Sequence, residues 1–320
     1  MGIAKNRRNG SQKTMKVCLD SMLVWYPKIK DLPIPQPKTE IVMLDQRELD
    51  RMIEENLPQS VVDKVKPIAE KIGYPCFIRT DLASGKHAWE NSCFVDNPDV
   101  LRKHIFEVIS FNLMADIFGL DFKAIIIREY IPMDSKYTAF YGQLPINPER
   151  RYFIENGTVL CHHPYWIEEA IEEPSVPNWR ELSKEMNYES PEEIKLLTSY
   201  SELVAKQFSK KTLSIDYCKA KDKRWILIDM ATASRSWHPE TCPNQKRLFT
   251  EARAEIGDIT RTFEYSKSPN YQKIIGGCKP KRTAYKNIKE QKKVFDFCLK
   301  NSIKQVKRRK LKLGNHEIPI

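Results

Sequence analysis

Hydrophobic and polar positions alternate with strand-like and helix-like periods from about residue 39 onward. The segment Thr39–Leu44, TEIVML, predicts an early strand. Asp45 and Glu48 directly after it form a pattern typical of a capping box, so a helix is expected to begin there. The next helical segment ends near Gly73, and Pro67 inside it is expected to kink or split it.

Two further segments show the spacing of amphipathic helices. Residues 97–119 predict one helix, with Asn97 as its cap and Gly119 closing it, and Ser190 caps another. Their inward faces are expected to consist of Leu101, Ile105, Val108 and Ile109 in the first helix and of Ile194, Leu197, Val204 and Phe208 in the second.

The remaining apolar runs have the length and composition of strands. A pair at 76–79 and 92–95 flanks a polar loop, and a buried strand covers 124–131. Residues 150–163 form two strands around Asn-Gly, a strong hairpin signal, and residues 213–231 form another pair. A loop rich in Pro, Glu and Trp runs to about Tyr188. Antiparallel pairs alternating with helices predict an α+β fold.

The net charge of +11 is concentrated near the C-terminus. Residues 273–312 hold 15 Lys/Arg against two acids, a local balance of +13, which leaves −2 for the rest of the chain. Such a segment attracts phosphate-rich partners, so nucleic acid is one candidate partner. The alternative is a solvated helix that keeps the protein soluble.

Several classes are disfavoured by what the sequence lacks. It contains no run of about 18 apolar residues, so we expect no membrane span. Its eight cysteines include no Cys-x-x-Cys pair, which argues against a disulfide scaffold or a zinc knuckle and favours a cytoplasmic setting. His162 and His163 are neighbours on a strand and therefore face opposite sides, so we expect them to be structural.

Two aspartates suggest a metal site. Asp216 ends the strand LSID, and Asp229 ends the strand ILID. At equivalent places on paired strands they would face one side of the sheet, where two like charges are unfavourable without a cation between them. Mg²⁺ suits such a pair, because it takes one or two carboxylates and leaves its other positions to phosphate and water. The alternative is two independent surface aspartates.

Basic side chains near these strands extend the hypothesis. Arg79 and Arg151 lie on predicted strands beside loops, and Lys86 lies in the polar loop. The guanidinium fork suits phosphate, although each arginine alone also suits a surface salt bridge. Together with the aspartates they predict a nucleotide–metal site. The sequence has neither Gly-x-x-x-x-Gly-Lys-[Ser/Thr] nor Gly-x-Gly-x-x-Gly, so it does not support a P-loop or a Rossmann site.

Five short motifs follow one another in an order that resembles the ATP-grasp superfamily over about residues 38–240. They are CFIRTDLASGK, IIIREYIP, ERRYF at 149–153, SIDY and LIDM. Arg79, where most members have lysine, resembles the clade in which arginine replaces one of the two usual lysines. The Glu-x-Arg-x-Phe strand and the closing LID are also similar to the eukaryotic cell-division-cycle ATP-grasp proteins that assist assembly of a translation initiation factor.

The resemblance implies an α+β fold in which two lobes clasp ATP. The N-terminal lobe would cover residues 38–131 and the C-terminal lobe residues 132–260. A basic N-terminal segment with the first strand region, 1–37, would precede them, and a basic extension, 261–320, would follow.

The resemblance also implies roles for individual residues. Arg79 and Lys86 would contact the phosphates beneath a lid at 82–87, and Arg151 would contact the γ-phosphate. The residues implied to bind the adenine end of ATP are Arg128, Glu129, Tyr130 and Ile131, and those implied to hold Mg²⁺ are Asp216 and Asp229.

One position departs from the family pattern. The usual second metal contact is an Asn two residues after the last acid, and here that position is Ala231. Thr232 or Ser234 is a candidate substitute, and a second Mg²⁺ is in doubt. We expect Ser234 and Arg235, which follow the last acidic strand, to contact the acceptor substrate or a phosphate.

Three functions fit these observations. The first is an ATP- and Mg²⁺-dependent ligase that activates a carboxylate as an acylphosphate for attack by an amine or thiol. The second is an ATP-dependent ligase or end-modifying enzyme acting on RNA or other nucleic acid. The third is an ATP-binding assembly factor without ligase turnover. The sequence does not name the acceptor.

Overall fold

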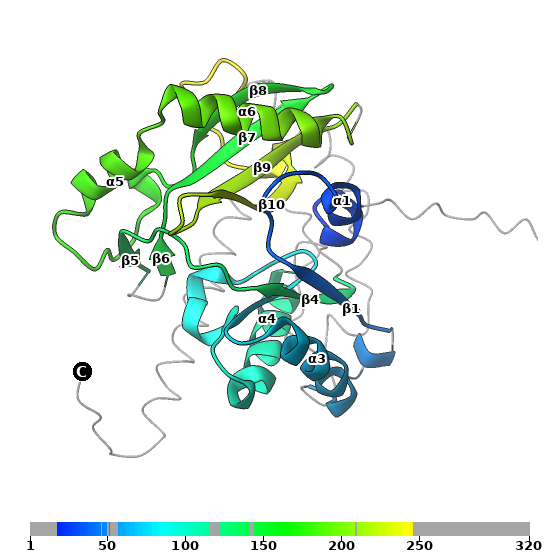
Figure 1. Ribbon diagram of the computed structural model, residues 1–320. Helices are drawn as coiled ribbons and strands as arrows, with labels where there is room; N and C mark the ends of the chain where they lie inside the picture. The colour runs from blue at the N-terminus through cyan, green and yellow to red at the C-terminus, as the bar shows by residue number, and fades with distance from the viewer. Residues whose placement is uncertain are drawn as a thin grey trace, which may run out of the picture. The chain divides into compact units, whose positions relative to one another are not determined.

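In the computed structural model, two four-stranded antiparallel sheets and a small two-stranded sheet organise the chain (Figure 1). The structure describes residues 18–45, 47–49, 51, 57–115, 122–140, 144–208 and 210–245. All of them belong to the first of two units into which the chain divides, Met1–Thr260. The expected helix end at Gly119 and the basic segment 273–312 lie outside the described residues.

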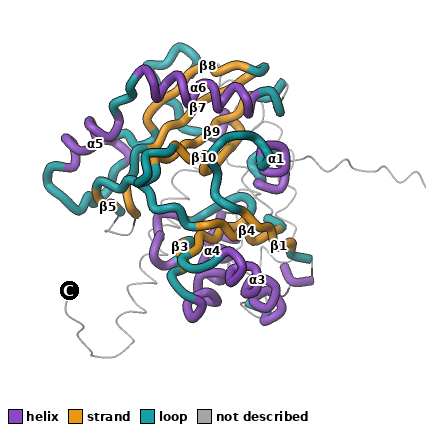
Figure 2. Tube along the Cα trace, in the orientation of Figure 1, coloured by secondary structure: helices purple, strands orange, loops and turns teal. Residues whose placement is uncertain are grey.

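The first sheet has the strand order β1-β4-β2-β3 (Figure 2). Its strands are β1 (Thr39–Met43), β4 (Ala124–Glu129), β2 (Cys76–Thr80) and β3 (Phe94–Val95). β2 and β3 pair antiparallel, as the sequence predicts, but β3 is shorter than expected. The connection between them contains a 3₁₀ segment, Lys86–Asn91.

Two helices, α3 (Gln59–Ile72) and α4 (Leu101–Ala115), cover one face of this sheet (Figure 1). The capping box before them is present, because Asp45 and Glu48 accept hydrogen bonds from each other's backbone N–H. The prediction that Pro67 splits α3 is wrong. Pro67 and Asp63, whose carbonyl loses its helical partner, are both exposed, so water can satisfy that carbonyl.

Strand β4 is buried on both faces. Ile125 and Ile127 pack in the core under α3 and α4, whereas Ala124 and Ile126 belong to the core shared with the second sheet. A strand buried on both sides has no polar alternation, which explains the continuous apolar run in the sequence.

The second sheet has the order β10-β9-β7-β8. Its strands are β7 (Glu149–Glu155), β8 (Thr158–Pro164), β9 (Thr212–Lys219) and β10 (Trp225–Thr232). Asn156 and Gly157 have φ angles of 50° and 86° and form the predicted tight turn. Asp216 and Asp229 lie inside β9 and β10 rather than at their ends, which corrects the expected strand boundaries.

Helices α6 (Pro191–Ala205) and α1 (Met22–Ile29) pack against the second sheet and share its core. Ser190 caps α6 as predicted, and its side chain accepts a hydrogen bond from the backbone N–H of Glu193. α1 lies in the segment that we expected to be basic with a first strand. Met22, Trp25 and Ile29, one turn apart, are buried there.

A third, small core lies beside the second sheet. It joins β5 (Tyr137–Ala139), β6 (Leu144–Ile146) and α5 (Trp179–Asn187), and the last of these replaces the loop expected up to about Tyr188. Together these elements confirm the α+β fold class.

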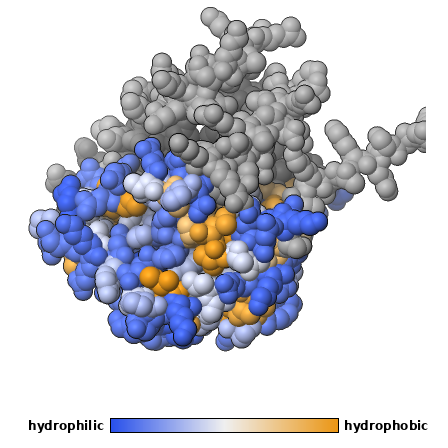
Figure 3. Space-filling model, turned by 90° about the horizontal axis from the view of Figure 1, so that it is seen from above, coloured by the Kyte–Doolittle hydropathy of each residue, from blue (hydrophilic) through white to orange (hydrophobic). Residues whose placement is uncertain are grey.

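The surface agrees with a composition that is 30% charged. In the view of Figure 3, most described surface residues are hydrophilic and hydrophobic ones form small groups between them. Among the described residues, no helix combines the length and the hydrophobicity needed to cross a membrane.

Candidate active site

Four chemically active side chains form one row across the second sheet. The register pairs Asp229 of β10 with Asp216 of β9, Asp216 with Arg151 of β7, and Arg151 with His163 of β8. Directly paired residues on neighbouring strands project from the same face. The register of β10 shifts between Leu227 and Asp229. We call these four residues the cross-strand row.

Arg151 and Asp216 form the strongest ion pair of this row. The Nε and Nη2 atoms of Arg151 each donate to one carboxylate oxygen of Asp216, both at 2.8 Å. Burial alone would lower the pKa of Arg151, but Asp216 outweighs it and raises that pKa. The guanidinium also lies 4.4 Å from the ring centre of Tyr165. This geometry is a two-pronged, charge-assisted bond that fixes both side chains.

Arg79 reaches the row from the first sheet. It lies on β2 and is only 4% exposed, and its Nη1 is 2.9 Å from Oδ2 of Asp229. Its Nε donates to the carbonyl of Thr80. The Asp229 side chain keeps 36% of its surface exposed, so it remains accessible from the cavity.

Lys86 forms a third cation–carboxylate pair, with Glu149 at the start of β7. Its Nζ lies 3.6 Å from Oε1 of Glu149 and 4.1 Å from the ring centre of Tyr165. Burial by itself would lower the pKa of Lys86, but Glu149 and then Tyr165 and Asp216 outweigh it and raise that pKa. Burial, opposed by Lys86 and reinforced by Asp216, raises the pKa of Glu149 to about 7.

Arg128, at the end of β4, holds the irregular part of β10. Its Nη1 donates to the carbonyl of Ile228 at 2.6 Å, and Ile228 lies where the β10 register shifts. Its Nε donates to Oγ1 of Thr39. Burial, together with the charge of Arg79, lowers the pKa of Arg128 to about 10. Arg128 therefore joins the two sheets through backbone and hydroxyl groups.

A cavity of about 590 Å³ lies between these groups. At one end it is lined by aromatic side chains, where Phe77 and Trp89 have ring centres 5.6 Å apart and Tyr130 packs edge-on against Phe94 at 5.0 Å. Glu129 also lines this end, and its carboxylate accepts a hydrogen bond from the backbone N–H of Lys38. The cavity thus has an aromatic end and a charged end.

Most of the residues singled out in the sequence line this cavity. They are Arg79, Lys86, Arg128, Glu129, Tyr130, Ile131, Arg151, Asp216, Asp229 and Arg235. Ser234 is not among the lining residues, whereas Ser236, two residues further on, is. Ala231, at the position of the usual Asn, also lines the cavity.

Sequence reasoning gave no role to three lining residues, Glu149, Tyr165 and Trp166. For Glu149 a signal existed, because it lies two residues before Arg151 on one strand and such residues share a face. For the two aromatic residues no local pattern pointed to the cavity.

The fold and this cavity define an ATP-grasp protein. The chain matches an ATP-grasp domain family, the third family of its clade, over residues 58–251, and it belongs to that family. This confirms the resemblance drawn from the five motifs. No curated protein sequence matches the chain.

Solved structures with a related fold share little sequence with the chain. Biotin carboxylase from Campylobacter jejuni, in complex with β-γ-ATP, is 13% identical with a TM-score of 0.43, over 70% of this chain and 42% of that one. D-alanine–D-alanine ligase from Bacillus anthracis, complexed with ATP, is 17% identical with a TM-score of 0.36, over 68% and 54%.

A third is the biotin carboxylase domain of 2-oxoglutarate carboxylase from Hydrogenobacter thermophilus, in complex with MgADP, ADP and bicarbonate. It is 12% identical with a TM-score of 0.42, over 69% of this chain and 41% of that one. The chain therefore spans about half or less of the length of these structures.

The donor set at the charged end fits Mg²⁺. Asp216 and Asp229 are direct cross-strand partners, and both line the cavity. An ionised carboxylate has about four lone-pair positions, so Asp216 can accept both bonds from Arg151 and still bind a cation. Carboxylate oxygens are the ligands that Mg²⁺ takes beside phosphate.

Proposed function

We propose that the protein is an ATP- and Mg²⁺-dependent ligase that activates a carboxylate as an acylphosphate. The observation that carries the proposal is the meeting of three cation–carboxylate pairs in one cavity. They are Arg79–Asp229, Arg151–Asp216 and Lys86–Glu149. Two of the cations come from the first sheet and its loop, and the third comes from the second sheet.

These pairs support an exchange of partners when ATP binds. The phosphate oxygens would take over Arg79, Lys86 and Arg151. Asp216 and Asp229 would then hold Mg²⁺, which supplies positive charge against the developing negative charge of the phosphates. Because each buried charge keeps an opposite charge beside it, the exchange avoids leaving an unpaired ion in a poorly solvated site.

The aromatic end of the cavity suits the base of ATP. Phe77, Trp89 and Tyr130 offer ring surfaces, and the chain at Glu129–Ile131 offers backbone groups at the edge of β4. This assignment places the triphosphate toward the charged end, where Arg79 and Arg151 lie.

The reaction then depends on position and charge rather than on a protein nucleophile. An oxygen of the substrate carboxylate attacks the γ-phosphorus in line, the bond from phosphorus to the bridging oxygen of ADP breaks, and an acylphosphate forms. An amine or thiol then attacks the acyl carbon, loses its proton and displaces phosphate. Arg151 would neutralise the γ-phosphoryl charge in the first step.

We place the substrate carboxylate near Arg235. This side chain lines the cavity and is 40% exposed, with its Nη1 2.7 Å from Oδ2 of Asp20. Ser236 replaces Ser234 as the hydroxyl beside it, because only Ser236 lines the cavity. These contacts do not select one acceptor, so the experiment below compares pools of acceptors.

The test is ATP turnover with Mg²⁺, with ADP plus phosphate resolved from AMP plus pyrophosphate. The protein is assayed with pooled amino acids and peptides and, separately, with pooled RNA. The test variants are Arg151→Lys, Arg79→Met and Asp216→Asn. The matched controls, Arg224→Gln and Asp222→Asn, come from an exposed pair 2.7 Å apart outside the cavity.

We expect ADP formation that rises with one amino-acid or peptide pool and falls at least about 100-fold in the test variants, as is usual when a preorganised charge contact is removed. The two controls keep wild-type rates. Turnover stimulated only by RNA would replace the proposal by a nucleic-acid enzyme. ATP binding without turnover in any pool would replace it by an assembly factor, in keeping with Ala231. Absence of ATP binding would refute all three.

A further inference from the structure

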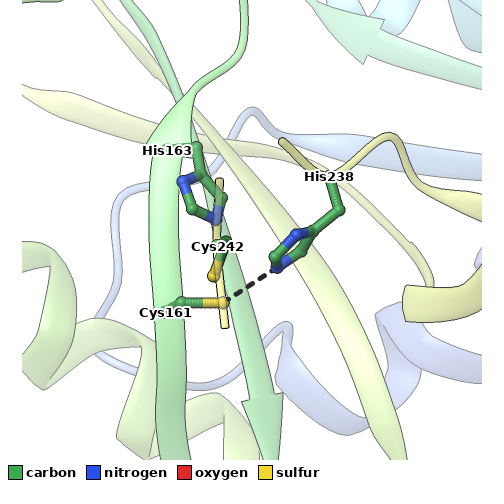
Figure 4. A group of neighbouring side chains, drawn as sticks. All are labelled: Cys161, His163, His238 and Cys242. Atoms are coloured by element: carbon green, nitrogen blue, oxygen red, sulfur yellow. Dashed lines mark hydrogen bonds between the residues drawn. The ribbon is translucent and has the colours of Figure 1, made fainter. Parts of the chain in front are cut away.

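A second group of polar side chains lies outside the ATP cavity. Cys161, His163, His238 and Cys242 each offer one ligand atom, and these four atoms all lie within 4.8 Å of one another. Figure 4 shows the side chains converging from β8 and from the segment after β10. We call them the Cys₂His₂ cluster.

The strand geometry explains why two of the four meet. Cys161 and His163 are two residues apart on β8, so both project from one face. His162 between them projects from the other face, where it stacks on Tyr152 and bonds Glu189. The expectation that His162 and His163 do not share a metal agrees with this arrangement. Pairing His163 with Cys161 instead gives a strand-borne Cys-x-His motif.

The other two members come from the loop that follows β10. His238 and Cys242 lie four residues apart, and the backbone N–H of Cys242 donates to the carbonyl of Pro239 at 3.0 Å. This turn brings both side chains toward β8. Asn244 fixes the loop further, because its Nδ2 donates to the carbonyl of Leu160.

The hydrogen bonds of the two imidazoles leave nitrogen atoms directed at the cluster. Nε2 of His238 lies 3.1 Å from Sγ of Cys161, while its Nδ1 lies 3.3 Å from the carbonyl oxygen of Pro239. A carbonyl at Nδ1 favours the tautomer in which Nε2 has the free lone pair, the usual arrangement around a ligating histidine. Nε2 of His163 is buried and has no hydrogen-bond partner among the described residues.

We propose that the Cys₂His₂ cluster binds one zinc ion in a structural, four-coordinate site. Two thiolates and two imidazoles are a ligand set typical of tetrahedral zinc, and a complete set of four protein ligands leaves no open position for catalysis. The absence of a Cys-x-x-Cys pair therefore did not exclude zinc, because the cysteines come from two different segments.

The site would cross-link the edge strand β8 to the loop after β10. That loop begins at Arg235 and Ser236, which line the ATP cavity, and His163 is the outer member of the cross-strand row beside Arg151. Zinc would thus hold the acceptor side of the cavity against the second sheet without touching ATP.

The test measures the zinc content of the full-length protein, purified without chelator from cells grown with zinc, by inductively coupled plasma mass spectrometry. We expect about one zinc per chain. Cys161→Ser and Cys242→Ser should lose it, and Co²⁺ exchanged into the wild type should give the intense visible absorption of tetrahedral thiolate coordination. Thermal unfolding of the wild type should shift to lower temperature with a strong chelator.

Two variants serve as matched controls. Cys18→Ser changes an exposed cysteine outside the cluster, and His162→Gln changes the neighbouring histidine on the other face of β8. Both should keep the zinc. Circular dichroism identifies the variants that fold, and the cobalt spectrum of the wild type tests the proposal even where a cysteine variant does not fold.

Three outcomes would overturn the proposal. They are wild-type protein without bound zinc that also gives no tetrahedral cobalt spectrum, zinc retained in both folded cysteine variants, and a Cys161–Cys242 disulfide found by peptide mass spectrometry in non-reduced protein. None of these results depends on ATP turnover, so the ligase proposal is tested separately.

Discussion

Glu149 shows how a single buried carboxylate can be held between two charge states. Its side chain is 4% exposed, Lys86 lies 3.6 Å away, and Asp216 adds a like charge nearby. Burial favours the neutral acid and the lysine favours the carboxylate. Because the burial effect and Asp216 prevail, the pKa of Glu149 rises from an ordinary value of 4.5 to about 7.

This shift predicts a pH-dependent stability at the residue scale. Between the unfolded pKa near 4.5 and the folded pKa of about 7, the folded state binds more protons than the unfolded state. The contribution of Glu149 to the free energy of unfolding is therefore present at pH 4.5 and is lost as the pH rises toward 7. Glu149→Gln should remove this loss, which amounts to at most about 3 kcal/mol.

The measurement is thermal unfolding of wild type and Glu149→Gln at pH 5 and pH 8. The variant should gain stability relative to wild type between these two pH values. Glu70→Gln, an exposed control, should show no such change. An equal difference at both pH values for Glu149→Gln would contradict the shifted pKa.

At the scale of elements, two glycines with left-handed backbone have different surroundings. Gly157 closes the β7–β8 hairpin at φ +86°, and a Cβ there would meet nothing within 4 Å. Gly85, with φ +64°, precedes the 3₁₀ segment that carries Lys86, and a Cβ there would lie 3.2 Å from Cγ of Phe111. The two positions thus separate backbone strain from steric contact.

We predict that Gly157→Ala costs about 1–2 kcal/mol of stability, the backbone penalty alone, and leaves ATP affinity unchanged. Gly85→Ala should cost more, because Phe111 must also move, and should weaken ATP binding because Ser84 and Lys86 line the cavity. Thermal unfolding and isothermal titration with ATP measure the two effects. Equal loss of ATP affinity in both variants would show that this loop has no special role.

The sequence predicted elements well where local chemistry decides them. The capping box at Asp45, the Asn-Gly hairpin and the Ser190 cap depend on residues within a few positions of one another, and all three are present. α1 and α5 were missed because both lie in stretches where proline and charge conceal short apolar faces. Their buried residues become recognisable only when the partner sheet is known.

The candidate site was predictable to the same degree. Arg79, Arg151, Asp216 and Asp229 stood out because charged residues within apolar strands are unusual. Their pairing across strands depends on register, and the irregularity before Asp229 is a feature that single-strand patterns do not contain. The Cys₂His₂ cluster was missed for a similar reason, since its two halves are about 75 residues apart in the chain.

At the scale of the whole molecule, the charge distribution separates two functions. The family match covers residues 58–251, whereas the +13 excess lies at 273–312, beyond the matched part. A basic segment binds polyanions mainly by releasing counterions, so the affinity depends steeply on salt.

We predict that RNA binding resides in this segment. The affinity for single-stranded RNA should fall at least about tenfold between low and physiological salt. Deletion of residues 273–320 should abolish binding while ATP affinity persists. A full-length variant with Lys307, Arg308, Arg309 and Lys310 changed to Gln controls for chain length and should flatten the salt dependence. Fluorescence anisotropy measures both, and salt-independent binding in the deletion would place the RNA site elsewhere.

The cross-strand row also determines where the chain tolerates a change in length. Deleting one residue inside β7 would turn Arg151 to the opposite face of the sheet and separate it from Asp216 and from His163 together. Residues added at the tip between Asn156 and Gly157 would leave every pair of the row in place. Length variation among relatives, and any engineered insertion, should therefore concentrate at that hairpin tip and avoid the strands on either side of it.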